Sequence, residues 1–117
     1  MANPNIINVG TLSGNTEVLS ITTSPTAIVS NGSGSGKLLK VSSLFISNAN
    51  TTTSATITVE LYRNSTSYYI MYRTPLPVGT TLDVISKYLY LKEGDSLRVT
   101  ALTSNEAFAV ASFEEIS

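Results

Sequence analysis

The chain has 117 residues with no cysteine and no histidine, which predicts one domain without disulfides, zinc sites or a histidine general base. Seven basic and eight acidic residues leave a formal net charge of −1, and no basic cluster could neutralise a run of phosphates, so nucleic acid is not an expected partner. Only 13% of residues are charged, against about 25% in typical domains, so we expect a polar, nearly uncharged surface of a kind compatible with an assembly subunit.

Residues 1–15 predict an extended arm rather than a packed element. They are rich in Asn, Gly, Pro and Ser, and their few apolar side chains are Ile6, Ile7, Val9 and Leu12. Such an arm either frays as a free terminus or becomes ordered against a neighbouring subunit through those apolar residues.

The chain shows no signal for a membrane or for secretion. No run of about 18 apolar residues occurs, and the first residues lack the basic start and apolar segment of a signal peptide. We therefore expect no membrane association and folding in a cytoplasm.

Residues 16–117 predict a β-sheet domain. Stretches that alternate apolar and polar side chains indicate half-buried strands. These expected strands cover residues 17–23, 26–30, 38–47, 55–63, 68–73, two segments within 80–102, and 107–115. About seven to nine strands at roughly ten-residue spacing predict an all-β fold, a single antiparallel β-sandwich that is jelly-roll-like, although an immunoglobulin-like sandwich gives similar spacing.

Two hairpins are predicted within this domain. The strands 55–63 and 68–73 are separated by a few polar residues, as in an antiparallel hairpin. The stretch Thr80–Val99 predicts a second hairpin around the turn Lys92–Asp95, whose carboxylates we expect in solvent. Between the two hairpins, the prolines of residues 74–79 are expected to end the sheet pairing.

The segment 38–47 is expected to be a central strand that is partly buried on both faces. Alternation places Val41 and Phe45 on one face and Leu44 and Ile46 on the other. The small residues of the last strand indicate close approach of another layer or of another subunit.

The glycine-rich stretch 31–36 does not predict a phosphate-binding loop. A P-loop ending at Lys37 would need glycine at position 31 and a hydroxyl residue at position 38, but these positions hold Asn31 and Leu38. A strand is also expected where the motif needs a helix.

No catalytic or metal-binding set is predicted. Glu93 and Asp95 lie two residues apart on a predicted turn, and no run of alternating acids supplies the about six to eight oxygens that Ca²⁺ prefers. A glycosidase would need two facing carboxylates, which the sequence does not place. We therefore expect no enzymatic activity, no cofactor and no metal.

Six tyrosines are the main candidate for an interface. They are Tyr62, Tyr68, Tyr69, Tyr72, Tyr88 and Tyr90. Tyrosines on a β-surface can bind sugars or form protein interfaces, whereas tyrosines paired across strands only stabilise the sheet. Cross-strand pairing or a subunit contact is favoured over a sugar site, because the chain has no tryptophan and few carboxylates flank the tyrosines.

Three stretches in the C-terminal third resemble a known group of proteins. They are residues 77–87 (PVGTTLDVISK), 91–101 (LKEGDSLRVTA) and 112–117 (SFEEIS). The group consists of small, mostly uncharacterised proteins encoded by tailed phages of marine bacteria and cyanobacteria, and its members are regarded as virion components. The resemblance extends from about Lys37 to Ser117.

This resemblance implies a structural protein of a virion that is assembled in the host cytoplasm, and it carries no functional residues. We expect a capsid decoration (cement) protein that stabilises the outer shell, with the arm reaching over neighbouring capsid subunits. The expected partners are further copies of the chain, a trimer being favoured, and the major capsid protein. The alternatives are a tail-fibre, baseplate or neck component, or a module that binds a glycan or a host receptor.

Overall fold

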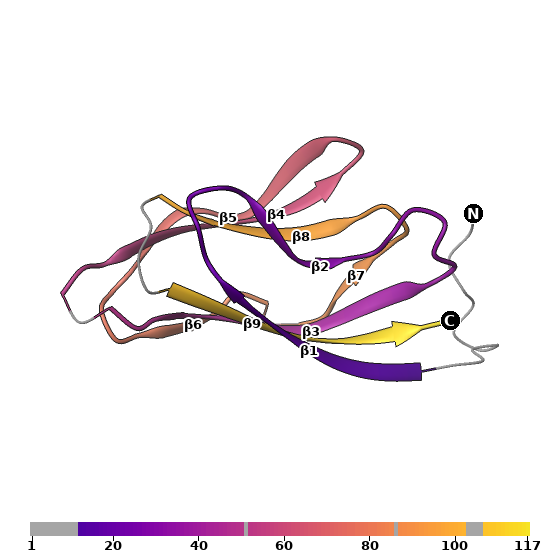
Figure 1. The fold of residues 1–117 in the computed structure, drawn as a ribbon, viewed down its shortest axis with the longest axis horizontal. Helices are drawn as coiled ribbons and strands as arrows, with labels where there is room; N and C mark the ends of the chain where they lie inside the picture. The colour runs from indigo at the N-terminus through magenta and orange to yellow at the C-terminus, as the bar shows by residue number, and fades with distance from the viewer. Residues whose placement is uncertain (1–11, 51, 86, 103–106) are drawn as a thin grey trace.

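The computed structural model describes residues 12–50, 52–85, 87–102 and 107–117, which form two antiparallel β-sheets without a helix. The strands are β1 (Leu12–Ser20), β2 (Thr26–Ser30), β3 (Leu38–Asn48), β4 (Ala55–Arg63), β5 (Thr66–Leu76), β6 (Thr81–Asp83), β7 (Leu89–Leu91), β8 (Ser96–Ala101) and β9 (Ala107–Ile116). Sheet A has the order β1-β9-β3-β6, with β7 also on β3, and sheet B has the order β2-β8-β4-β5. The two sheets lie face to face in a sandwich-like arrangement (Figure 1), which confirms the predicted all-β fold.

The strand pairs are nested along the chain. β4 pairs with β5, β3 with both β6 and β7, β2 with β8, and β1 with β9. The described chain is therefore one long antiparallel hairpin with its tip between β4 and β5. Rolling this hairpin places successive pairs in alternate sheets, and β6 and β7 share one position beside β3.

The core lies between the two sheets. Its fully buried side chains include Val41, Leu44, Ile46, Ile57, Val59, Leu91, Leu97 and Val99. On β9, Ala107, Ala109 and Ala111 face this core, while Phe108 points outward and is 40% exposed. The small residues of the last strand thus allow the close approach of the other layer of the same molecule.

A β-bulge in β3 changes which residues face the core. The register with β9 shifts between Val41 and Ser43. Val41 and Leu44 are therefore both fully buried, although strict alternation would put them on opposite faces, and Phe45 is 41% exposed. The prediction that Val41 and Phe45 share a face is wrong because the extra residue of the bulge reverses the alternation.

The turn Lys92–Asp95 does not close a hairpin. β7 pairs with β3 in sheet A, whereas β8 pairs with β2 and β4 in sheet B. The turn therefore carries the chain from one sheet to the other, and the predicted hairpin over Thr80–Val99 is wrong. The alternation of apolar and polar residues indicates that each strand is half-buried, but it does not identify the strand with which it pairs.

The hairpin between β4 and β5 is confirmed. Its turn contains Asn64 and Ser65, both with positive φ, as the tight two-residue turns of hairpins require. Pairing continues to Pro75 and Leu76, beyond the predicted end of the strand. Proline is tolerated there because β5 is an edge strand of sheet B.

β1 begins inside the segment predicted as an arm. Leu12 pairs with Ile116 and Asn15 with Phe113, so residues 12–15 belong to sheet A. The other predicted contact residues of the arm, Ile6, Ile7 and Val9, lie outside the described residues.

Candidate binding site

The six predicted interface tyrosines do not form one surface. Tyr62, Tyr69 and Tyr72 lie on the outer face of sheet B, as the register of β4, β5 and β8 shows. Tyr88 and Tyr90 lie beside β3 on the outer face of sheet A, where Lys40 lies 4.1 Å above the ring of Tyr88. Tyr68 is the cross-strand partner of Leu61 and projects from the other face of sheet B, 54% exposed.

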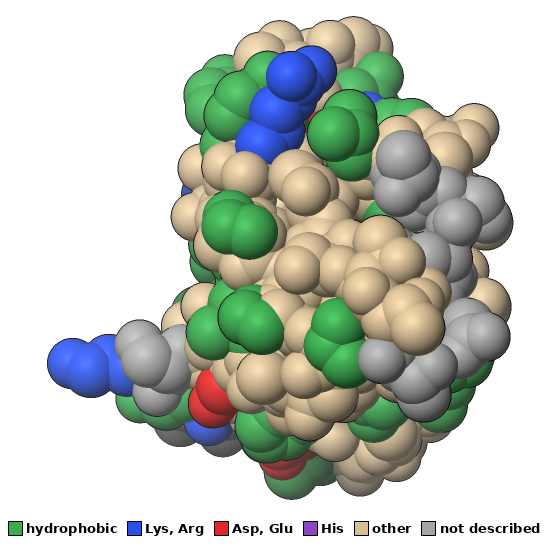
Figure 2. Space-filling model, turned by 90° about the vertical axis from the view of Figure 1, so that its left-hand side faces the viewer, with side chains coloured by type: hydrophobic (Ala, Val, Ile, Leu, Met, Phe, Trp, Pro, Cys, Tyr) green, Lys and Arg blue, Asp and Glu red, His purple; other side chains and the backbone are tan. Residues whose placement is uncertain are grey.

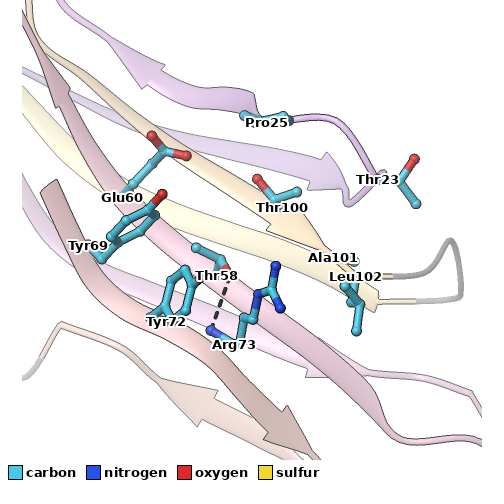
Figure 3. A pocket seen from close by; sticks show the side chains of 10 residues that line it. All are labelled: Thr23, Pro25, Thr58, Glu60, Tyr69, Tyr72, Arg73, Thr100, Ala101 and Leu102. Atoms are coloured by element: carbon cyan, nitrogen blue, oxygen red, sulfur yellow. Dashed lines mark hydrogen bonds between the residues drawn. The ribbon is translucent and has the colours of Figure 1, made fainter. Parts of the chain in front are cut away.

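A pocket of about 270 Å³ opens on the outer face of sheet B (Figure 3). Strands β4, β5 and β8 form its floor and one wall, and the loop before β2 forms the opposite side. Its lining residues are Thr23, Pro25, Thr58, Glu60, Tyr69, Tyr72, Arg73, Thr100, Ala101 and Leu102.

Irregular pairing between β4 and β5 brings three side chains of β5 to this pocket. Val59 pairs with Met71 and Glu60 with Tyr69, so the register shifts between these two pairs. A second shift places Tyr72 and Arg73 opposite a single residue of β4. Tyr69 and Tyr72, three residues apart, therefore share the outer face, because bulges re-aim the side chains beside them.

Arg73 is held in an unusual conformation at this bulge. Its φ is 47°, a value that a non-glycine residue rarely adopts, and its backbone N–H donates to Thr58 Oγ1 at 3.1 Å. Figure 3 shows its guanidinium between Thr58 and the Ala101–Leu102 segment. The guanidinium carbon lies 5.3 Å from the centre of the Tyr72 ring, and this ring meets Tyr69 edge to face at 4.7 Å.

The other charged groups at the pocket neutralise each other. Glu60 is 3% exposed and accepts a hydrogen bond from Arg98 Nη2 at 2.9 Å, while the Arg98 guanidinium stacks on Tyr62 at 3.8 Å. Arg73 takes part in none of the ion pairs among the described residues. The hydroxyl of Thr100 is buried and has no hydrogen-bond partner in the same part of the chain. The pocket thus offers one unpaired cation, and an unpaired hydroxyl lies buried at its floor.

The acidic turn has a structural role rather than a place in solvent. Asp95 accepts two hydrogen bonds from Arg63, from Nε at 2.8 Å and from Nη2 at 2.6 Å, and its side chain is 3% exposed. Glu93 accepts a hydrogen bond from the backbone N–H of Gly36 at 2.7 Å. The prediction of solvated carboxylates is therefore wrong for Asp95, and Glu93 is half-buried.

The Asp95 carboxyl remains ionised despite its burial. Burial alone would raise its pKa, but the hydrogen bonds from Arg63 and from the backbone of Lys92, together with both positive charges, hold the pKa below its usual value. Within the described residues, no three acidic side chains gather in a way that could hold a metal ion.

The outer face of sheet A is the other notable surface. Val18 on β1, Val110 on β9 and Phe45 on β3 are direct cross-strand neighbours, and Phe108 lies one pleat further along. Val18 is 67% exposed and Phe45 is 41% exposed. Figure 2, a view onto one end of the sandwich, shows mainly uncharged polar groups with scattered hydrophobic and few charged side chains, in agreement with the composition.

The fold and the pocket define a class: a two-sheet antiparallel β-protein with a polar and aromatic pocket on one outer face. No helix in the described residues is long and apolar enough to cross a membrane. Neither the protein-family models nor the curated proteins contain a match to this chain. The sequence predicted Tyr69 and Tyr72 as interface candidates but missed Arg73, Thr58 and Thr100, because the bulges that join them leave no signal in the alternation.

Proposed function

We propose that this chain is a non-enzymatic structural protein of a phage virion, folded as a jelly roll, and that it decorates the outer surface of the capsid. The nested strand pairing carries the proposal. Two sheets of order β1-β9-β3-β6 and β2-β8-β4-β5 are the arrangement that a rolled pair of Greek keys produces, with β6 and β7 as one interrupted strand. Jelly rolls recur in viral capsid proteins and in lectins.

The pairing of consecutive strands supports a jelly roll over an immunoglobulin-like sandwich. In immunoglobulin domains the first two strands pair with each other within one sheet. Here β1 lies in sheet A and β2 in sheet B, and among the described strands only β4 and β5 are consecutive partners. Among the proteins with this architecture, the sequence stretches that resemble phage virion proteins favour a viral structural protein over a lectin.

The outer face of sheet A supports a role in assembly. Its exposed apolar side chains Val18, Phe45 and Phe108 lie close together, and exposed apolar patches mark protein contacts. Asp83 is the cross-strand partner of Phe45 and adds a negative charge at the edge of this patch. The partners we propose are other copies of the chain, a trimer being favoured, and the major capsid protein. Mass measurement of the purified chain in solution tests the oligomer directly, and a strictly monomeric chain at micromolar concentration would contradict it.

The copy number per particle tests the position in the virion. Quantitative mass spectrometry of purified particles is expected to give hundreds of copies, and cryo-electron microscopy is expected to place them on the shell. Three, six or twelve copies would instead indicate the neck, tail or fibre. Recovery of the protein only in the tail fraction of dissociated particles would overturn the capsid assignment.

A second candidate function is a module that binds a glycan or a host receptor. The pocket with the Tyr69–Tyr72 pair favours it, since tyrosine offers an apolar ring and a hydroxyl to one ligand. Host adsorption by particles that carry Tyr69→Ala and Tyr72→Ala tests this function. Unchanged adsorption would exclude binding of the host receptor through this pocket without affecting the structural role.

A further inference from the structure

We infer that the pocket on the outer face of sheet B binds a saccharide that carries a carboxylate, with Arg73 pairing with the carboxylate and the Tyr69–Tyr72 pair contacting the sugar ring. This inference rests on the second candidate function and names its ligand class. Four independent observations on the pocket lead to it: its net charge, its aromatic wall, its polar floor and the backbone of Arg73.

The charge of the pocket selects an anionic ligand. The carboxylate of Glu60 is already paired with Arg98 at 2.9 Å, so these two charges cancel. Arg73 has no ion-pair partner among the described residues, and its guanidinium reaches into the pocket (Figure 3). A guanidinium presents a planar fork of donors that matches both oxygens of a carboxylate. A cationic ligand would be repelled, and a neutral one would leave the fork unused.

The aromatic wall selects a ligand with an apolar face. Tyr69 and Tyr72 are 57% and 55% exposed, although they contact each other at 4.7 Å. Their rings therefore remain open to a flat partner, and sugar rings combine such a face with hydroxyl groups. The Arg73 guanidinium lies 5.3 Å from the Tyr72 ring centre, so a carboxylate bound to Arg73 would place an attached ring beside Tyr72.

The floor of the pocket offers partners for sugar hydroxyls. Thr58 and Thr100 are cross-strand neighbours at this floor. Thr58 Oγ1 accepts from the backbone N–H of Arg73 and still has its own proton to donate. Thr100 Oγ1 has no partner in the described part of the chain, and because it is buried it reaches a ligand only after its side chain rotates. The volume of about 270 Å³ lies just below the range of about 300–1,000 Å³ that drug-sized ligands fill. A pocket of this volume suits one sugar residue at the end of a glycan or on one of its side branches.

The backbone conformation of Arg73 indicates that its side chain has a role in ligand binding. A positive φ of 47° is strained for arginine, and asparagine or glycine would adopt it more easily. Strain of this kind concentrates at functional sites, and here the bulge that causes it also points Arg73 and Tyr72 into the same pocket.

Calorimetric titration of the 117-residue chain with matched monosaccharides tests the inference. Methyl glucuronide is expected to bind saturably, and at least tenfold more tightly than methyl glucoside, which differs only at the carboxylate. High salt is expected to weaken the binding of the glucuronide but not of the glucoside, because salt screens the ion pair between Arg73 and the carboxylate. Equal affinity for the two sugars, or no saturable binding of either, would overturn the inference.

Three variants assign the effect to residues. Arg73→Asn, which tolerates a positive φ, is expected to reduce glucuronide affinity about tenfold or more and to leave glucoside binding unchanged. Tyr72→Ala is expected to weaken the binding of both sugars. Tyr88→Ala is the matched control, because Tyr88 is similarly exposed beside a cation but lies on the opposite sheet. A folded Arg73→Asn protein with full glucuronide affinity would refute the role of Arg73.

The outcomes separate this inference from the proposed functions. If glucuronide binds but host adsorption is unaffected by the tyrosine variants, the ligand class stands and the receptor function fails. If no sugar binds while the chain occurs in hundreds of copies on the shell, the ligand class fails and the structural role stands.

Discussion

The substitution Asp95→Asn tests whether the buried ion pair at the turn between the sheets holds the fold together. Asparagine keeps the shape of the side chain but removes the charge and one acceptor. Asp95 accepts three hydrogen bonds, two from Arg63 and one from the backbone N–H of Lys92 at 2.8 Å. An asparagine can keep only part of this set, since its amide nitrogen is a donor that would face other donors.

The expected cost follows from the exposure of the two partners. Breaking a buried pair by removing one partner costs about 3–5 kcal/mol, because the other charge is left uncompensated. The Arg63 side chain is 35% exposed and can be hydrated, so the low end of this range, about 3 kcal/mol, is expected. For a domain of this length such a loss corresponds to a fall in the melting temperature of about 12 °C.

The effect has a defined pH dependence. The pKa of Asp95 lies below its usual value of 3.8 in the folded protein, so its ionised form stabilises the fold. That contribution is fully present above the pKa of the unfolded chain, at about 4, and is lost as the pH falls through the lower folded pKa. The difference between wild type and Asp95→Asn should therefore be constant from about pH 7 to pH 5 and shrink below about pH 4.

Urea denaturation at pH 7, 5 and 3 measures this difference. Glu114→Gln is the matched control, because it makes the same chemical change in a surface pair with Lys40 at 4.0 Å and is expected to cost no more than about 0.5 kcal/mol. If Asp95→Asn costs no more than this control at pH 7, or if its cost is undiminished at pH 3, the ion pair does not stabilise the protein as argued.

Three further predictions concern the core, the hairpin and the loop after β3. Leu97→Ala should cost about 3–5 kcal/mol in urea denaturation, since Leu97 is fully buried between the sheets, and a cost below about 1 kcal/mol would contradict this packing. Ser65→Gly should raise the stability by about 0.5 kcal/mol, because φ is 58° at this turn, and a lower melting temperature would argue against the turn geometry. Asn48→Ala should cost about 2–4 kcal/mol by thermal denaturation, because its buried amide donates to the carbonyls of Thr53 and Leu76, each at 3.0 Å; a neutral effect would mean that water satisfies both.

The sequence predicted the strands well because half-buried strands impose a period of two on the side chains. Ile57 and Val59 on β4 and the alanines of β9 face the core as their alternation indicates. The partners of the strands were harder to predict. The pairing of β7 with β3 joins residues about 50 positions apart, and nothing local distinguishes it from a hairpin with β8.

The bulges explain most of the remaining differences. One extra residue in β3 reverses its alternation, and the shifts between β4 and β5 gather Tyr69, Tyr72 and Arg73 on one face. A bulge depends on the register of two strands that are already paired, so single-strand patterns do not reveal it. The candidate pocket was therefore only half predictable, from its tyrosines and not from its arginine.

The turn Lys92–Asp95 and the β5 wall of the pocket have different tasks in the fold. The stretch 91–101 contains the turn whose Asp95 binds Arg63 of β4, and Glu93 of this turn holds Gly36 of the loop between β2 and β3. The turn and the loop each cross from one sheet to the other, so these contacts tie both sheets together. Tyr69, Tyr72 and Arg73 lie outside the three stretches that carry the resemblance. Thr100 and Ala101 of the pocket nevertheless lie within the stretch 91–101, so only the wall formed by β5 is separate from the segment that joins the sheets.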